Sequence, residues 1–434
     1  MSGARRIAAD ILAELEKSES YSNLAIDAAL KNAELTKADS AFVTRLVYGV
    51  TERKLTLDYY IDKLSKKPSS ALSEKVQAAL RMAIYQIVYM DKVPNSAAVN
   101  ESVNLIKKSR EKYAAGFVNA VLRNFLREQP KLPTGNGDKA LSVKYSCPQW
   151  FITELTSYIG QESTERFLEN SLEPAPTFLR VNTLKTTVNE LKEQLFKDGI
   201  ETEKTALRDE ALCSIGFGSV RAINGFSNGL FYIQDISAQT AISVLGAEKG
   251  DRVLDVCASP GGKSISAAMH MQNVGEIVSC DIHKHRVKLI EDNAKRLGVS
   301  CIKAIVNDAT VYNESLGKFG KIICDVPCSG FGVIRRKPEI KYKPKSDLTN
   351  LPDLQYNILE NSARYLKTGG TLLYSTCTLR REENEAVVER FLKNHSEYLP
   401  QKTEVLGTIA FCHRLMPSVN GGDGFFFAVI RKER

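Results

Sequence analysis

After residue 235 the chain alternates short apolar runs with longer segments of helical periodicity. Strands that are apolar throughout are buried on both faces of a sheet, and strands joined by helices run parallel. The pattern therefore predicts a doubly wound α/β domain over residues 233–434, completed by a terminal antiparallel strand at 425–430. The expected parallel strands lie at 252–256, 277–281, 302–306, 322–325 and 371–374, and the expected helices at 262–271, 284–297, 348–366 and 380–393.

The first third of the chain has a different pattern. Apolar residues recur there at helical spacing, for example every fourth residue from Leu72 to Val88, which predicts an all-helical domain over residues 1–135. Residues 145–232 mix helical stretches with β-favouring pieces at 177–181 and 229–233, which indicates a small α/β linker subdomain. A chain of 434 residues is long enough for three such domains.

The net charge of +8 is concentrated in the helical third. Residues 1–150 hold 23 Lys and Arg against 16 Asp and Glu, whereas the remaining residues hold 36 against 35. Positive charge collected in one segment favours a polyanionic partner such as nucleic acid. Lys107, Lys108 and Arg110 are the expected contacts to an RNA backbone, and a basic face that only keeps the domain in solution is the alternative.

The cysteine count and the N-terminal charges bear on the compartment. Nine cysteines are an odd number, and Asp10, Glu14 and Glu16 interrupt the apolar stretch that a signal peptide needs. No apolar run reaches the roughly 20 residues of a membrane-crossing helix. We therefore expect free thiols in a cytoplasmic protein without membrane contact, and, because the chain has no C-x-x-C pair, no metal.

A glycine-rich turn follows the first expected strand, in the sequence LDVCASPGGKS at 254–264. In open α/β sheets ligands bind at the carboxyl ends of the strands, where glycine lets the backbone come close. The turn has neither the dinucleotide fingerprint nor the P-loop spacing, and a plain tight turn is the alternative. We predict a nucleotide-type pocket formed by Cys257, Ala258, Ser259, Pro260, Gly261, Gly262 and Lys263.

Two acidic residues stand at the ends of the next two strands. Asp281 lies where such folds place a carboxylate that accepts ribose hydroxyls, and Asp308 is placed to receive an exocyclic amine. Either residue alone is more often a cap or a turn residue. Their recurrence at successive strand ends favours a role in binding the cofactor.

Two cysteines stand at the ends of the last two parallel strands. Asp325 and Cys328 end the fourth strand in CDVPCSGFGVIRRKPEIK (324–341), and Cys377 ends the fifth in YSTCT (374–378). Neighbouring strand ends face one crevice, so we expect both thiols and the carboxylate to reach one substrate. A buried structural cysteine is the ordinary alternative for either thiol alone.

A basic loop follows Cys328 directly. Arg335, Arg336, Lys337 and Lys341 are predicted to hold the phosphates around a target nucleotide, with a solvated loop as the alternative.

These motifs resemble those of the S-adenosylmethionine-dependent RNA cytosine-5 methyltransferases. The similarity of LDVCASPGGKS, DVPCSGFGVIRR and YSTCT covers most of residues 230–434. Together with a helical domain similar to NusB, it extends over the whole chain to the bacterial RsmB (Sun/Fmu) branch. The resemblance implies a Rossmann-like catalytic domain, S-adenosyl-L-methionine as cofactor, and methylation of a cytosine in 16S rRNA by a monomer.

The resemblance also assigns roles to the crevice residues. Cys377 is implied as the nucleophile that adds to carbon 6 of cytosine, and Cys328 as the group that helps remove the carbon 5 proton. Asp325 is implied to hydrogen-bond the base and to bind near the cofactor, and Lys263 to orient the base or Asp325. From residue types alone the two cysteine roles are interchangeable.

Two other classes of protein remain open at this stage. One is a non-catalytic RNA-binding factor with a relic catalytic domain, and the retention of Cys377, Cys328 and Asp325 weighs against it. The other is an NAD-dependent oxidoreductase, which the missing dinucleotide fingerprint disfavours.

Overall fold

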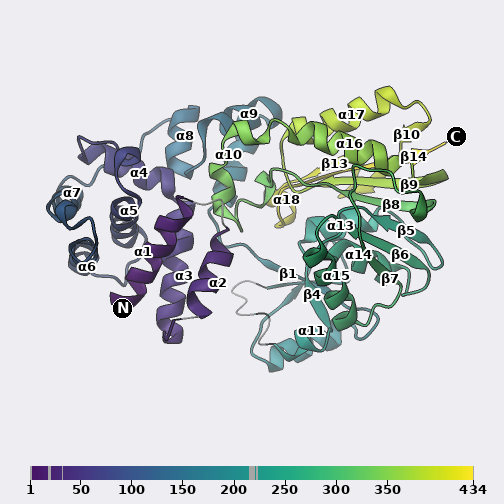
Figure 1. Cartoon of the computed structure of the whole chain (residues 1–434), viewed down its shortest axis with the longest axis horizontal. Helices are drawn as coiled ribbons and strands as arrows, with labels where there is room; N and C mark the ends of the chain where they lie inside the picture. The colour runs from purple at the N-terminus through teal and green to yellow at the C-terminus, as the bar shows by residue number, and fades with distance from the viewer. Residues whose placement is uncertain (1, 18–20, 32, 215–219, 221–222, 434) are drawn as a thin grey trace. The chain divides into compact units, whose positions relative to one another are not determined.

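The computed structural model describes residues 2–17, 21–31, 33–214, 220 and 223–433, and they form two compact units (Figure 1). The first unit consists of Met1–Leu172 with Arg336–Lys343, and the second of Glu173–Arg335 with Pro344–Arg434. Among the described residues, no helix combines the length and the apolarity that crossing a bilayer requires.

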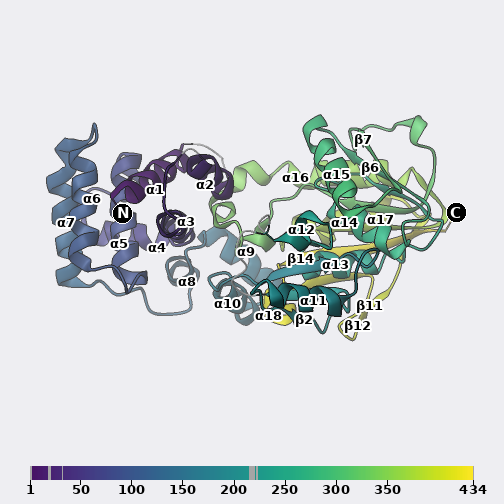
Figure 2. The same ribbon diagram turned by 90° about the horizontal axis from the view of Figure 1, so that it is seen from below.

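The first unit is all-helical, as expected. Its central helix is α5 (Glu74–Tyr89), in which every residue from Val76 to Gln86 is buried. A helix buried on all sides must be surrounded, and α5 packs on α1, α3, α4, α6 and α7. In Figure 2, α6 and α7 lie side by side at one edge of the unit. The other helices of this unit are α1 (Ser2–Leu15), α2 (Ser22–Lys31), α3 (Lys37–Glu52), α4 (Lys54–Leu64), α6 (Asn95–Lys107), α7 (Ala115–Glu128), α8 (Asp138–Tyr145), α9 (Gln149–Ile159) and α10 (Gln161–Asn170).

Two segments join the first unit contrary to their place in the expected scheme. Helices α9 and α10 fall in the range 145–232 of the expected α/β subdomain, but they pack on α8 and belong to the helical unit. The 3₁₀ helix η6 (Pro338–Tyr342) comes from the C-terminal part of the chain and packs on α3. Pro338, Ile340 and Lys341 of this helix are buried.

The second unit begins with a small antiparallel sheet. Its strand order is β2-β3-β1-β4, and β1 occupies the range 177–181 that the sequence predicts. The elements of this part are β1 (Thr177–Val181), α11 (Val188–Lys197), β2 (Glu203–Lys204), β3 (Ala211–Ser214), α12 (Asn224–Ser227) and β4 (Phe231–Ile233).

A larger sheet of order β10-β14-β9-β8-β5-β6-β7 fills the rest of the second unit, with β13 paired to β14. Strands β7, β6, β5, β8 and β9 are parallel, and β14 is antiparallel to β9, which confirms the doubly wound domain with a terminal antiparallel strand. The strands are β5 (Arg252–Asp255), β6 (Glu276–Asp281), β7 (Ile302–Val306), β8 (Phe319–Asp325), β9 (Leu366–Thr376), β10 (Tyr398–Pro400), β13 (Cys412–Leu415) and β14 (Phe425–Lys432), and β11 (Thr403–Val405) pairs with β12 (Thr408–Ala410).

Helices cover both faces of this sheet (Figure 1). One apolar cluster joins the sheet to α13, α14 and α15, and another joins it to α16 and α17. These helices are α13 (Ile236–Ser243), α14 (Gly262–His270), α15 (Lys284–Leu297), α16 (Leu351–Ala363), α17 (Glu385–Asn394) and the short α18 (Pro417–Asn420).

The strand order reverses between β5 and β8. From β5 the chain proceeds outward to β6 and β7, and then returns to the other side of β5 as β8 and β9. In doubly wound sheets ligands bind outside the carboxyl ends of the strands at such a reversal. The glycine-rich turn after β5 and the cysteine turns after β8 and β9 all lie at this edge.

Candidate active site

The glycine-rich turn connects β5 to α14. Gly261 has φ +102°, a left-handed conformation that favours glycine, and its N–H donates to the Ala258 carbonyl at 2.6 Å. The Ala258 N–H donates in turn to the Cys280 carbonyl of β6 at 2.7 Å. The turn that contains residues 257–263 is thus tied to the neighbouring strand, and α14 begins at its end.

Asp255 supports the turn from below. Its side chain is buried and accepts a hydrogen bond from Ser264 Oγ at 2.6 Å, and Ser279 Oγ donates to Ser264 Oγ at 2.8 Å. Burial raises the pKa of Asp255 to about 7. The carboxyl group therefore holds the first turn of α14 on β5 and β6.

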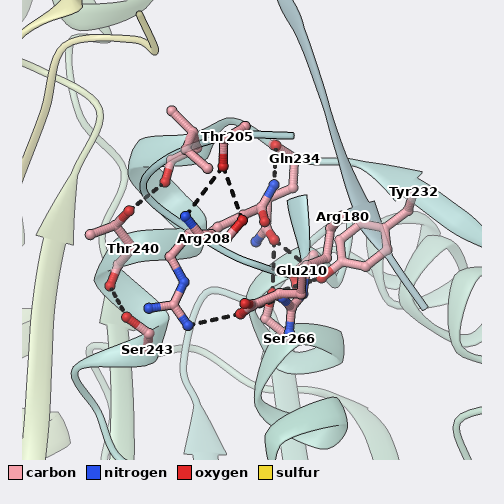
Figure 3. A network of polar contacts seen from close by, with 12 residues as sticks. Arg180, Thr205, Arg208, Glu210, Tyr232, Gln234, Thr240, Ser243 and Ser266 are labelled. Carbon is pink, nitrogen blue, oxygen red and sulfur yellow. Dashed lines mark hydrogen bonds and ion pairs between the residues drawn. The ribbon is translucent and has the colours of Figure 1, made fainter. Parts of the chain in front are cut away.

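A second polar network, which is buried, joins β4 and the following Gln234 to α14 (Figure 3). Tyr232 Oη is 2.6 Å from Ser266 Oγ and 3.2 Å from the Gly262 carbonyl oxygen, and Ser266 Oγ donates to Gln234 Oε1 at 2.7 Å. Burial raises the pKa of Tyr232 to about 12, so the phenol stays protonated. The small sheet thereby fixes the helix that carries Lys263.

The predicted pocket acids lie at the ends of β6 and β7. Asp281 is the last residue of β6, is only 6% exposed, and accepts the His283 N–H at 3.0 Å. Asp308 lies two residues beyond the end of β7, not at its last residue as expected, and accepts from Thr310 Oγ1 at 2.7 Å. Both follow strands that run parallel to β5, so they belong to the same edge as the glycine turn.

Asp325 and Lys263 form an ion pair at the centre of this edge. Lys263 Nζ donates to Asp325 Oδ2 at 2.7 Å, and Ser375 Oγ donates to Asp325 Oδ1 at 2.7 Å. Burial by itself lowers the pKa of Lys263, but the Asp325 carboxylate outweighs it and raises that pKa above its usual value. The lysine therefore carries a positive charge and keeps the carboxylate oriented.

The two predicted thiols are neighbours. Cys328 lies in the turn after β8, Cys377 follows β9, and their Sγ atoms are 3.4 Å apart. All nine cysteines are free. The turns that carry the thiols are joined by backbone bonds, because Gly332 donates to the Cys377 carbonyl at 2.9 Å and Val326 to the Ser375 carbonyl at 3.2 Å.

The surroundings of the two thiols differ in charge. The hydrogen bond between the two sulfur atoms is the main cause that lowers the pKa of Cys377 below its usual value, and the Lys263 ammonium acts in the same direction. The same hydrogen bond and burial raise the pKa of Cys328 well above its usual value, and the Glu383 carboxylate adds to this. Of the pair, Cys377 is therefore the thiol whose surroundings favour the ionised form.

Glu383 is a site residue that the sequence analysis missed. It is fully buried, its Oε2 accepts from Ser329 N at 2.8 Å and from Gln355 Nε2 at 3.0 Å, and its Oε1 accepts from Arg380 at 3.1 Å. The carboxylate thus joins the turn after Cys328 to the turn after Cys377. Its sequence neighbours Arg381 and Glu382 are charged, which is typical of a solvated face, so no local signal marked it.

The basic residues of the loop after Cys328 differ in their burial and in their contacts. The prediction for Lys341 is wrong: it is fully buried, and its Nζ donates to the Glu52 carbonyl at 2.8 Å, so it does not contact phosphates. Arg335 donates to the carbonyls of Glu173 and Pro174 at 2.9 and 2.6 Å. Arg336 is half-buried, and Lys337 is exposed with its Nζ 4.9 Å from the centre of the Tyr21 ring. RNA contact by Arg335, Arg336 and Lys337 stays a prediction.

The other predicted RNA contacts lie at the end of α6. Lys107, Lys108 and Arg110 are all exposed. Their side chains are accessible to a polyanion, and their role also stays a prediction.

The residues present at the strand ends fit a nucleoside cofactor. The turn after β5 offers backbone groups at the start of a helix, Asp281 offers a carboxylate, and Asp308 offers a second one at the next strand. A carboxylate beside such a turn is the hydrogen-bond acceptor that ribose hydroxyls require. Among the described residues, no group of three His, Cys, Asp or Glu side chains is arranged to hold a metal ion.

Three protein families match consecutive parts of the chain. Residues 2–127 match the NusB family, residues 147–220 match a ferredoxin-like domain of RsmF/B-like methyltransferases, and residues 242–431 match the 16S rRNA methyltransferase RsmB/F. This order agrees with the expected helical, small α/β and catalytic parts.

Relatives of similar length match over the whole chain. The "Probable ribosomal RNA small subunit methyltransferase B" of Bacillus subtilis is 37% identical over 99% of this chain and 98% of its own length. The protein of the same description from Synechocystis is 33% identical and is covered completely in both chains.

Solved structures agree with the fold. The structure of PH0851 superposes with a TM-score of 0.85 at 27% identity, over 100% of this chain and 99% of that one. NSun6 from Pyrococcus horikoshii, solved with SFG, has a TM-score of 0.61 at 22% identity and covers 66% of this chain and 98% of its own.

Proposed function

The chain belongs to the 16S rRNA methyltransferase RsmB/F family, and from this premise we propose that it methylates carbon 5 of one cytosine in 16S rRNA through a covalent Cys–cytosine adduct. The observation that carries the proposal is the pair of thiols, 3.4 Å apart, at the strand ends where Lys263 and Asp325 also meet.

Two thiols suit this reaction because it has two steps that need a sulfur or a base. Carbon 5 of cytosine is a weak nucleophile until a thiolate adds to carbon 6 and turns the ring into an enamine. Cys377 is the thiol whose pKa is lowered, so it forms the Sγ–carbon 6 bond. The electrostatics thus support the assignment that residue types alone left open.

Cys328 acts after the methyl group has moved. Once Cys377 Sγ is bonded to carbon 6, it no longer carries the charge that kept Cys328 protonated. The Cys328 thiol then releases its proton to water and accepts the proton of carbon 5. The electrons of that carbon–hydrogen bond restore the ring double bond, and the bond from carbon 6 to Cys377 Sγ breaks, which regenerates the Cys377 thiolate.

Asp325 holds the base during these steps. Its carboxylate is oriented by Lys263 and Ser375, each at 2.7 Å, so it accepts hydrogen bonds from the exocyclic amine and the protonated ring nitrogen of the adduct. Lys263 also prevents the pocket from collecting uncompensated negative charge as Cys377 ionises.

S-adenosyl-L-methionine supplies, when bound, the electrophilic methyl group on a sulfonium. Residues Cys257 to Lys263 would hold it through the backbone of the turn, Asp281 would accept hydrogen bonds from its ribose hydroxyls, and Asp308 would receive the exocyclic amine of its adenine.

The substrate cytosine must be unpaired or turned out of its helix, because a base inside a duplex is out of reach of the thiols. Arg335, Arg336 and Lys337 contact RNA phosphates, and Lys107, Lys108 and Arg110 contact a further part of the RNA backbone. The reaction takes place in the cytoplasm, where rRNA is assembled into subunits, and one chain is sufficient for it.

The test uses two alanine variants on denaturing gels with 16S rRNA and S-adenosylmethionine. We expect Cys377→Ala to form neither product nor adduct, and Cys328→Ala to accumulate enzyme bound covalently to RNA. Cys301→Ala removes a thiol outside the crevice and is the control that keeps full activity. An adduct with Cys377→Ala and none with Cys328→Ala reverses the assignment.

Equilibrium binding separates the rival classes. S-adenosylhomocysteine is expected to bind and NAD is not, and binding of NAD alone would support the oxidoreductase. RNA binding without any 5-methylcytosine in mapped 16S rRNA would support the non-catalytic factor.

A further inference from the structure

An apolar groove lies on the helical unit, remote in sequence from the cysteine motifs. It has a volume of about 550 Å³, within the range of small-ligand sites. Leu72, Val76 and Val121 lie among its apolar lining, and the end of α4, the start of α5 and one face of α7 form its walls. Neither the expected RNA contacts nor the catalytic proposal uses it.

Two aromatic rings stand on one wall of the groove. Tyr113, in the 3₁₀ turn before α7, is 82% exposed, and Phe117 follows it by four residues. Residues four apart lie on the same face of a helical segment, so both rings face the groove that they line.

Lysines form the opposite rim. Lys66 and Lys67 are exposed and line the groove, and the lining residues that the structure describes include no acid. Ser65 Oγ accepts the Lys67 N–H at 3.1 Å and donates to the Lys67 carbonyl at 2.6 Å, which fixes the turn that carries both lysines. The rim is therefore positive and ordered before any partner arrives.

The groove also continues the basic stretch of the helical unit. Lys107, Lys108 and Arg110 precede Lys112 and Tyr113 in the chain, and all are exposed. Cations close in sequence to an aromatic ring that lines an apolar groove suit single-stranded nucleic acids, since phosphates need the charges and bases need the ring faces.

We propose that this groove binds an unpaired nucleobase of the rRNA, stacked on Tyr113 and Phe117, with its flanking phosphates on Lys66 and Lys67. The proposal rests on the proposed function only in taking RNA as the partner. The site anchors the RNA through a base other than the cytosine that is methylated.

The test is fluorescence anisotropy without cofactor, with a labelled single-stranded 16S rRNA fragment as the probe and its duplex as a comparison. Stacking on an aromatic ring contributes enough that Tyr113→Ala is expected to weaken single-strand binding about 10-fold. Tyr113→Phe keeps the ring and is expected to stay within about twofold. The same holds for the control Phe196→Ala, which removes an aromatic residue of α11 that is 71% exposed.

The lysines are tested through salt dependence. Lys66→Ala with Lys67→Ala is expected to lower the slope of log affinity against log salt by about 1.4, because each phosphate contact to a single strand contributes about 0.7. The matched pair Lys192→Ala with Lys197→Ala on α11 is expected to leave the slope unchanged. Photo-crosslinking of the fragment carrying 5-iodouridine is expected to label Tyr113 or Phe117.

The proposal is overturned if Tyr113→Ala binds the single strand as tightly as the parent protein, or if no groove residue is crosslinked. Unchanged affinity of Tyr113→Ala is also the result expected if the groove binds a protein segment instead of RNA. Methylation assays separate this failure from failure of the chemistry. If only the groove is wrong, the parent enzyme forms 5-methylcytosine and Tyr113→Ala keeps its RNA KM. If only the chemistry is wrong, the binding differences persist without 5-methylcytosine.

Discussion

Lys263 at the strand ends and Lys341 in the segment Arg336–Lys343 are both largely removed from solvent, but their pKa values shift in opposite directions. Lys263 is 16% exposed and faces the Asp325 carboxylate, which raises its pKa. Lys341 is fully buried and donates to a carbonyl, that of Glu52, and burial lowers its pKa to about 8.

The difference shows what an ion pair adds to burial. A carbonyl dipole satisfies a hydrogen bond, but it does not offset the loss of hydration of a full charge. The charge on Lys263 is therefore secure at neutral pH and available for the reaction, whereas the charge on Lys341 is held at a cost in stability.

The same substitution at both lysines gives the largest expected difference. Lys263→Met leaves Asp325 without its cation, and we expect kcat to fall about 10³-fold, in the range for loss of one preorganised electrostatic group. Lys341→Met, the matched control, is expected to keep kcat within about threefold. The measurement is single-turnover methylation of 16S rRNA, and similar losses at both positions break the comparison.

A third buried charge extends the comparison within the crevice. Glu383→Gln puts an amide where three donors converge, and we expect the free energy of unfolding to fall by about 3 kcal/mol, as for a broken buried ion pair. Glu382→Gln changes the neighbouring residue, which is 49% exposed, and is expected to cost at most about 0.5 kcal/mol. Urea denaturation measures both, and equal midpoints contradict the role given to Glu383.

The pH dependence of stability isolates Lys341. Its folded pKa of about 8 lies below its unfolded value, so between pH 8 and 10.5 the unfolded chain binds more protons at this residue. The contribution of Lys341 to the free energy of unfolding therefore rises with pH in that window. At about 1.4 kcal/mol per pH unit, the rise between pH 8 and 9.5 is up to about 2 kcal/mol.

Lys341→Met is expected to remove this rise. The measurement is the difference in urea midpoint between the parent and the variant at pH 7.5 and at pH 9.5. Parallel curves for the two proteins would show that Lys341 is hydrated in solution.

Replacing exposed cations is expected to have the smallest effect on stability. Lys107, Lys108 and Arg110 are not buried, so replacing all three by alanine is expected to change the free energy of unfolding by less than about 0.5 kcal/mol. RNA affinity is expected to fall and its salt slope to decrease by about 2, for three contacts of about 0.7 each. An unchanged slope in salt titrations removes these residues from the RNA contact surface.

Local sequence patterns were sufficient to predict the strands whose ends carry the site residues. The apolar runs at 302–306 and 425–430 appear as β7 and in β14, and β6 and β8 end at the residues expected from their runs. Strand periodicity is a property of neighbouring residues, and parallel strands bring their ends to one edge whatever the loops do. Cys328 and Cys377 meet for that reason.

Glu383 and Lys341 show where local patterns fail. Both lie in charged stretches that are typical of solvent-facing loops, yet both are fully buried. Glu383 meets Ser329 across 54 positions, and Lys341 meets Glu52 across 289. Whether a charged side chain is solvated depends on which distant segment packs over it, and no spacing within the loop contains that information.

The order of strands and helices, the glycine turn and the two thiols were thus set by the sequence, because each depends on residues close together in the chain. Tertiary packing alone decided which sulfur ionises, which lysine keeps its charge and where the Arg336–Lys343 segment is anchored. These depend on electric fields and burial, which many distant residues create together once the chain has folded.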